Sequence, residues 1–275
     1  MKTTQTILST VFLTSGFIIS TFAGPASIPD YSKDKNPVVQ QTVCDPKWYI
    51  SIGGGTDFDY QATDFFNSAR SLVFGGAVLL DINSHTYDSV YNTNFYRIQG
   101  EVGYVLTNHI EVFGLFKYSH ADSEVTSGST ATVVGGPSFV LTDHWGDYSA
   151  WGGELGLRYF FLPKEARFRP YVSISGGATA VDSIDLLVID STGSTAFKGA
   201  LYDNSVVGTG ALLLGLEVRV TCHFSVGADA GVRYESKLEG NDTDLTAQGY
   251  SAISNVNDAG DRLYCPLTVY AKFRF

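Results

Sequence analysis

Methionine, cysteine, positive charge and long apolar runs are all scarce in this chain. It has one methionine and three cysteines among 275 residues, and 18 basic residues against 28 acidic ones. The lack of positive charge disfavours a nucleic-acid partner, because surfaces that bind phosphates are basic. Beyond the N-terminus, no apolar run resembles a membrane-spanning helix of about 20 residues. A membrane-embedded mature protein would therefore need a closed β-barrel, in which every backbone polar group finds a partner strand.

Glycine and aromatic residues are abundant instead, with 29 glycines, 16 tyrosines and 18 phenylalanines. This composition favours a β-rich protein with many turns. Residues 267–275 alternate between apolar and polar side chains, and the chain stops on Phe275. A soluble β-sandwich also alternates in this way, but an amphipathic strand that ends on an aromatic residue favours the closing strand of an outer-membrane barrel.

The N-terminus has the pattern of a secretory signal peptide. Lys2 precedes an apolar run with small residues after it, which predicts a signal over residues 1–23 with cleavage after Ala23 or Ala26. The alternative is a membrane anchor, which the polar residues within the run disfavour. No cysteine lies near the cleavage point, so a lipoprotein is not expected. Residues 24–46 are polar and proline-containing, which predicts a periplasmic leader, and residues 47–275 are then the barrel.

Eight alternating segments have about the length of a tilted membrane-crossing strand. Three short connections, at 107–109, 162–168 and 221–223, alternate with long ones at 58–94, 119–147, 181–209 and 235–264. This asymmetry is typical of short periplasmic turns and long extracellular loops. The sequence therefore predicts an all-β fold, an eight-stranded antiparallel up-and-down transmembrane β-barrel. The segments are 47–57, 95–106, 110–118, 148–161, 169–180, 210–220, 224–234 and 265–275.

Residues 72–80 and 133–141 are also apolar enough to be strands. Adding both would give a ten-stranded barrel, but it would lose the regular alternation of short and long connections. We therefore interpret these two segments as hairpins or caps inside the outer loops.

One face of the eight segments is apolar and carries no charged residue. An Arg or Lys facing lipid at mid-depth would cost about 2–4 kcal/mol, so this is the predicted lipid face. Aromatic residues collect on it near both strand ends, which predicts two girdles at the membrane interfaces. The predicted girdle residues are Trp48, Tyr96, Tyr104, Tyr118, Trp151, Tyr159, Phe161, Phe224, Tyr234, Phe273 and Phe275.

The opposite face carries charges of both signs. The interior of an eight-stranded barrel is just wide enough for its side chains, and a buried unpaired ion is costly, so we predict a lumen plugged by ion pairs. The alternative is a narrow, low-conductance porin in which the pairs exchange partners. The predicted network comprises Arg97, Glu101, Glu111, Lys117, Glu154, Arg158, Arg169, Glu217, Arg219, Asp229, Arg233, Lys272 and Arg274.

Glycine-aromatic patterns recur in the strands, as in Gly100 to Tyr104 (GEVGY) and Gly153 to Tyr159 (GELGLRY). With these patterns and the terminal Phe275, residues 47–275 resemble the small eight-stranded outer-membrane family that includes the OmpA transmembrane domain, OmpX and the Opa adhesins. The resemblance implies a multi-pass protein of the bacterial outer membrane, contact with its lipid and lipopolysaccharide, and reading of the last strand by the barrel-insertion machinery. Because the chain ends at that strand, we expect no peptidoglycan-binding domain and no tethering role.

The predicted outer loops are acidic, with net charges of −3, −4, −3 and −4 against −10 for the whole chain. Solubility and mutual repulsion account for this charge, and divalent cations that bridge the loops are an alternative. The segment 241–244 (NDTD) has spaced oxygen ligands but lacks the glycine and glutamate of a calcium loop. Apolar runs at 72–80, 133–141 and 184–189 either extend strands or form a docking surface for a partner, as in adhesion.

No motif in the chain predicts an enzyme, a cofactor or a metal site. His85, His120 and His144 each have serine or aspartate neighbours in sequence, such as Ser119 and Asp122 beside His120, but a lipid hydrolase or acyltransferase would need catalytic geometry at the rim. His109 and His223, in the short turns, are expected to meet only solvent or headgroups. Cys44 and Cys222 both fall at the periplasmic end, which predicts a disulfide between them, with Cys265 left over; the alternative is three free thiols.

Overall fold

The computed structural model describes residues 46–62, 72–74, 78–81, 90–91, 95–133, 135–241, 243 and 261–275. The chain divides into two compact units, residues 1–43 and 44–275, and all described residues belong to the second. The predicted signal peptide lies outside the described residues, as does the predicted leader apart from Pro46. Among the residues described, no helix is long and apolar enough to span a membrane.

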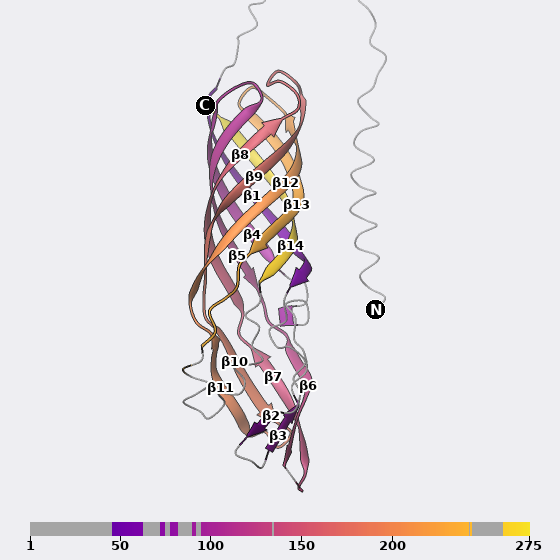
Figure 1. The fold of residues 1–275 in the computed structure, drawn as a ribbon. Helices are drawn as coiled ribbons and strands as arrows, with labels where there is room; N and C mark the ends of the chain where they lie inside the picture. Colours follow the sequence, from indigo (N-terminus) through magenta and orange to yellow (C-terminus); the bar gives the residue numbers. More distant parts are fainter. Residues whose placement is uncertain are drawn as a thin grey trace, which may run out of the picture. The chain divides into compact units, whose positions relative to one another are not determined.

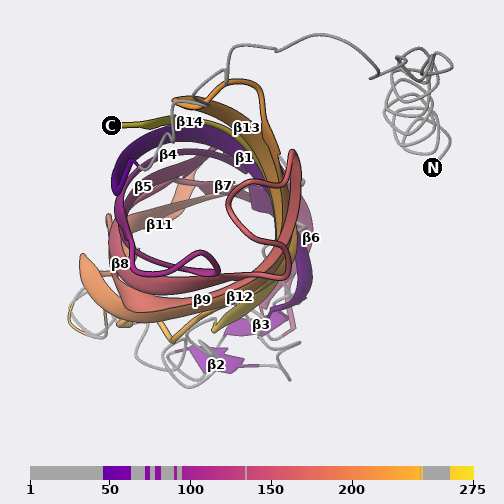
Figure 2. The same cartoon turned by 90° about the horizontal axis from the view of Figure 1, so that it is seen from above.

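Eight antiparallel strands close into a barrel in the order β1-β14-β13-β12-β9-β8-β5-β4 (Figures 1 and 2). The first and last strands complete the ring, with Tyr49 opposite Arg274 and Phe58 opposite Cys265. The eight-stranded up-and-down barrel predicted from the sequence is therefore confirmed. Its strands are β1 (Trp48–Ala62), β4 (Tyr96–Val105), β5 (Ile110–Ala121), β8 (Tyr148–Phe160), β9 (Phe168–Val181), β12 (Ser205–Arg219), β13 (Phe224–Glu235) and β14 (Arg262–Arg274).

Two of the short turns use the same local chemistry, threonine followed two residues later by histidine. The Thr107 hydroxyl accepts a hydrogen bond from the backbone N–H of Ile110 at 3.1 Å, which satisfies a donor within the turn. Nδ1 of His109 lies 2.8 Å from the carbonyl oxygen of Phe160, and Nδ1 of His223 lies 2.8 Å from that of Arg274. The expectation that these histidines meet only solvent or headgroups was wrong, because each ring binds the end of a neighbouring strand.

The long connections contribute a second, six-stranded antiparallel sheet in the order β11-β10-β7-β6-β3-β2. It lies beyond the end of the barrel opposite the chain's C-terminus (Figure 1). Its strands are β2 (Leu72–Phe74), β3 (Val78–Asp81), β6 (Val125–Val133), β7 (Ser138–Trp145), β10 (Ile184–Asp190) and β11 (Thr195–Tyr202). The ten-strand alternative was wrong: the apolar segments near 72–80 and 133–141 pair within this sheet and not within the barrel.

The turn between β10 and β11 is set by one side chain. Asp190 Oδ1 accepts hydrogen bonds from the Thr192 hydroxyl at 2.6 Å and from the Ser194 backbone N–H at 2.9 Å, while Gly193 supplies a φ of 84°. These hydrogen bonds, first of all that from the Thr192 hydroxyl, hold the pKa of the Asp190 carboxyl below its usual value, because they favour the charged form.

One hydrophobic core joins the sheet to the mouth of the barrel. Trp145 of β7, Leu186 of β10 and Phe197 of β11 pack in the same cluster as Tyr148 and Val207 from barrel strands. All of these side chains are buried. In the apolar run 184–189, Ile184, Leu186 and Val188 are buried in this core, whereas in the run 133–141 only Leu141 belongs to it.

Candidate functional site

The lumen of the barrel is the candidate functional site, because charged side chains from all eight strands meet there. Successive residues of a strand point to opposite faces, so every second side chain faces inward. All predicted members of the lumen network except Arg219 are buried. Arg219 lies at the short-turn end of the barrel, where its Nη1 donates a hydrogen bond to the carbonyl oxygen of Lys164 at 2.6 Å.

A first group of ion pairs lies near the short turns. Oε1 of Glu217 lies 2.6 Å from Nη2 of Arg274, and its Oε2 lies 2.8 Å from Nζ of Lys272. Nη1 of Arg169 lies 3.3 Å from Oε1 of the same carboxylate. Glu111 shares two of these cations, with Oε2 2.9 Å from Nζ of Lys272 and Oε1 3.4 Å from Nη2 of Arg274. We call these five residues the short-turn cluster.

Arg158 lies next to the short-turn cluster and interacts with both a carboxylate and aromatic rings. Its Nη1 and Nη2 donate to the two carboxylate oxygens of Glu101 at 2.9 and 3.0 Å, a bidentate pairing. Its guanidinium carbon lies 4.8 Å from the ring centroid of Tyr171 and 4.9 Å from that of Phe113. The side chain therefore combines an ion pair with cation–π contacts, and both interactions offset the free-energy cost of removing the guanidinium from water.

A second group of ion pairs lies nearer the long connections. Nζ of Lys117 lies 2.9 Å from Oε1 of Glu235 and 3.3 Å from Oε1 of Glu154, and Nη1 of Arg233 lies 2.5 Å from the same Glu154 oxygen. Arg97 forms an ion pair with Asp57, and its Nη2 donates to the Thr268 hydroxyl at 2.8 Å. The long-loop cluster comprises Asp57, Arg97, Lys117, Glu154, Arg233 and Glu235.

Sequence reasoning missed three buried lumen charges. Asp57 lies on a predicted strand but was left out of the network, whereas Glu235 and Arg262 were assigned to a loop. The guanidinium carbon of Arg262 lies 3.7 Å from the ring centroid of Phe95. The signal that could have found Glu235 and Arg262 is the alternation of the sequence, which continues past the predicted end of β13 and begins before the predicted start of β14. One predicted member is held differently, since Asp229 accepts a hydrogen bond from the Tyr171 hydroxyl at 2.9 Å.

Inward-facing aromatic rings lie over glycines of adjacent strands. In each case the aromatic residue and the glycine are direct cross-strand partners, and a Cβ on the glycine would overlap the ring. This explains part of the abundance of both residue types, because the narrow lumen has room for a ring only where the opposing residue has no side chain. The four pairs are Tyr49–Gly103, Phe113–Gly156, Tyr171–Gly215 and Tyr270–Gly227.

Little free space remains beside the short-turn cluster. A pocket lined by Glu111, Arg169, Glu217 and Arg274 has a volume of about 20 Å³, which is room for about one water molecule. At the opposite end of the barrel, Trp145 and Tyr148 belong to a cluster of buried apolar side chains.

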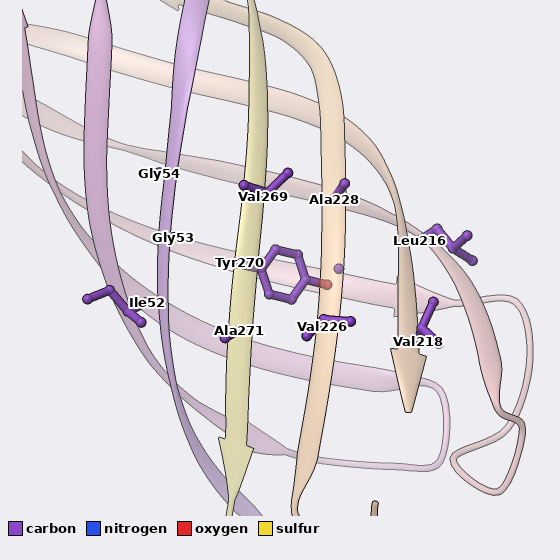
Figure 3. A pocket seen from close by; sticks show the side chains of 11 residues that line it. Ile52, Gly53, Gly54, Leu216, Val218, Val226, Ala228, Val269, Tyr270 and Ala271 are labelled. Atoms are coloured by element: carbon purple, nitrogen blue, oxygen red, sulfur yellow. The ribbon is translucent and has the colours of Figure 1, made fainter. Parts of the chain in front are cut away.

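The outer wall of the barrel is apolar and carries the predicted girdle residues. Near the short turns the rings of Trp48 and Tyr104 lie 4.9 Å apart, and near the long connections those of Tyr118 and Trp151 lie 4.3 Å apart, between centroids. The wall also has an open apolar hollow of about 660 Å³. Ile52 and Leu216 lie at its two sides, with Ala228 between them (Figure 3). Its apolar lining on the outward face suits lipid hydrocarbon.

The cysteines and the weak cation motif are only partly within the described residues. Cys222 is disulfide-bonded and Cys265 is free. Cys44 lies outside the described residues, so its pairing with Cys222 stays a prediction. In segment 241–244, Nδ2 of Asn241 donates to Oδ1 of Asp203 at 2.8 Å, while Asp242 and Asp244 lie outside the described residues.

The serine and aspartate residues next to the histidines in sequence are not all their neighbours in space. Ser119 is buried and faces the lumen, so it does not accompany His120; the hydroxyl of Ser149 on β8 lies 3.0 Å from Nδ1 of His120 instead. Asp143 is buried, whereas His144, next to it on β7, is half-buried. His85 lies outside the described residues. The expectation that the protein is not an enzyme stays a prediction.

Comparison with models of known protein families finds no match, and comparison with curated proteins finds none. Several solved structures of outer-membrane β-barrels are similar. Neisserial surface protein A is 12% identical over 83% of this chain and 97% of its own, with a TM-score of 0.43. The attachment invasion locus protein Ail of Yersinia pestis is 12% identical over 83% and 99%, with a TM-score of 0.40. The outer membrane protease OmpT of Escherichia coli is 11% identical over 83% and 97%, with a TM-score of 0.34. At these identities the likeness concerns the fold alone.

Proposed function

We propose that this chain is an integral protein of a bacterial outer membrane whose lumen is plugged by ion pairs and whose six-stranded sheet acts at the cell surface, in envelope structure or recognition. Outer-membrane lipid and lipopolysaccharide would surround the barrel, and the insertion machinery would read strand β14. Two observations support the proposal: the charged side chains that face the lumen are buried and paired, and a buried apolar core joins the six-stranded sheet to the barrel strands.

The outward face of the barrel supports the membrane location. Leu155 is 77% exposed, Ile52 67% and Leu214 64%. In water these side chains would expose a large apolar surface to solvent, which is unfavourable. Within the described barrel strands, no Asp, Glu, Lys or Arg lies on this face. A soluble barrel would place polar residues there, whereas hydrocarbon favours this surface.

The sheet beyond the barrel supports a role at the surface. Its strands β7, β10 and β11 share the buried core with barrel strands, which favours a sheet held on the barrel over independently moving loops. Apolar side chains such as Val125 (59% exposed) and Val140 (52% exposed) remain on its surface. A fixed sheet with exposed apolar residues offers a partner a preformed surface, which lowers the entropic cost of binding.

Conductance measurement tests the plug. The refolded protein, with folding checked by heat-dependent gel mobility, is inserted into a planar bilayer beside a general porin as a positive control. We expect folded protein to produce no steady channel steps, because water would have to pass the buried ion pairs of the lumen. Steady, ion-selective steps would contradict the plugged lumen and favour the narrow porin, with Glu101, Glu154 and Glu217 as the first residues to mutate.

Labelling of intact cells tests the orientation. Ser194 lies in the exposed turn between β10 and β11, and Glu165 is exposed in a short turn. In cells expressing Ser194→Cys, a membrane-impermeant maleimide is expected to label the protein, whereas Glu165→Cys should be labelled only after lysis. The parent chain, which retains Cys265, gives the background. The reverse pattern would show that the sheet faces the periplasm and would contradict a role at the surface.

A further inference from the structure

A small cluster of potential metal ligands lies at the rim of the barrel, on its outer side. His120 is near the end of β5 and lies opposite Ser149 of β8 in the strand register. Asp122 follows β5 directly, and Asp147 precedes β8 directly. The pairing of β5 with β8 therefore brings together ligands from the two ends of the connection between these strands. The neighbouring pair toward the barrel centre is Tyr118 and Trp151, so the cluster lies one step beyond the aromatic girdle.

The ligand atoms converge closely. Nε2 of His120 lies 3.2 Å from Oδ1 of Asp122. One ligand atom from each of His120, Asp122 and Asp147 lies within 4.8 Å of the other two. Metal–ligand bonds of about 2.0–2.2 Å require only small further movements, and the side chain of Asp122 is 81% exposed and free to make them.

The contacts of the histidine suit metal binding. Nδ1 of His120 lies 3.0 Å from the hydroxyl oxygen of Ser149, and the ring contacts those of Tyr96 and Tyr118 at centroid distances of 5.2 and 6.3 Å. When Nδ1–H donates to that hydroxyl, Nε2 keeps its lone pair and faces the carboxylates. Histidines that bind metals are held in this way by a hydrogen bond at the other ring nitrogen.

We propose that His120, Asp122 and Asp147 form a binding site for a divalent transition-metal ion of the zinc class. One imidazole and two carboxylates suit Zn²⁺, whereas Ca²⁺ and Mg²⁺ prefer oxygen ligands alone. Three protein ligands leave the fourth tetrahedral position to water. The bound ion joins the β5–β6 connection to the β7–β8 connection at the base of the sheet. The site is independent of whether the lumen conducts.

Calorimetric titration of the refolded, tag-free protein with zinc chloride in detergent micelles tests the site. We expect one ion per chain, and binding at least about tenfold weaker in His120→Gln and in Asp147→Asn, because each variant removes a ligand. His144→Gln is the matched control: this half-buried histidine lies on β7 of the six-stranded sheet and outside the cluster, and its loss should leave the affinity unchanged. Heat-dependent gel mobility confirms that each variant folds.

Two results would overturn the proposal. One is the absence of zinc binding at concentrations up to about 100 μM, where a specific three-ligand site should be occupied. The other is equal binding in the parent chain, His120→Gln and Asp147→Asn, which would place the ion elsewhere. In a parallel titration, Ca²⁺ should bind more weakly than Zn²⁺; a preference for Ca²⁺ that survives His120→Gln would likewise contradict the role of the imidazole.

Discussion

Glu217→Gln is expected to lower the free energy of unfolding by about 3–5 kcal/mol, the cost of breaking a buried ion pair by removing one partner. The Glu217 side chain is fully buried and within 3.3 Å of cationic nitrogens from Arg169, Lys272 and Arg274. Without its charge, Glu111 would remain as the acidic partner of three cations in the short-turn cluster. Urea unfolding in lipid vesicles, followed by tryptophan fluorescence, measures the change.

The matched control is Glu239→Gln, the same substitution at an exposed position after β13. Its free energy of unfolding should stay within about 0.5 kcal/mol of the parent value, as is usual for a surface substitution. If Glu217→Gln also stayed within that range, the short-turn cluster would not contribute to stability through ion pairing, and the account of the lumen as a set of mutually required charges would be wrong.

Gly103→Val is expected to destabilise the barrel by about 1–3 kcal/mol, because it overfills a packed interior. Gly103 faces the lumen opposite Tyr49, and even a Cβ at this position would overlap the tyrosine ring. The ring cannot turn aside freely, since its hydroxyl accepts a hydrogen bond from Arg158 and the ammonium of Lys272 lies 4.2 Å from its centroid. The urea titration described for Glu217→Gln also measures this change.

Gly100→Val on the same strand provides the comparison. Gly100 faces outward, and a Cβ there would meet no atom within 4 Å. An added apolar side chain on the outward face should change the free energy of unfolding by less than about 1 kcal/mol. Equal losses at both positions would indicate that valine harms β4 through its backbone, and would remove the aromatic-glycine pairing as the reason for these glycines.

The strands and their two faces are readable from the sequence because alternation is a local property. Each strand buries one face whichever strands lie beside it, so the period of two predicts both its existence and the inward position of Glu111, Lys117 and Glu217. Short turns are equally local, and the connections near 107–109 and 221–223 agree with the structure. The predicted boundaries were least accurate at the long-loop ends. There β12 begins at Ser205 and not at 210, and β14 begins at Arg262 and not at 265.

Partners across the lumen are not readable from the sequence, because closure of the barrel joins residues that no local pattern relates. Lys117 meets Glu235 at a separation of 118 residues, and Lys272 meets Glu111 at 161. Which charges face each other depends on strand register and tilt, and alternation specifies neither. The six-stranded sheet was missed for the same reason, since its strands come from separate connections.

The proposed metal site of His120, Asp122 and Asp147 shows both contributions at once. Alternation places His120 on the outward face of β5, and sequence proximity supplies Asp122. Asp147 and the Ser149 hydroxyl reach the histidine only because β5 pairs with β8 in one particular register. Local chemistry therefore determines what each strand presents on each face, and the closed sheet, by setting register, determines which of those side chains meet.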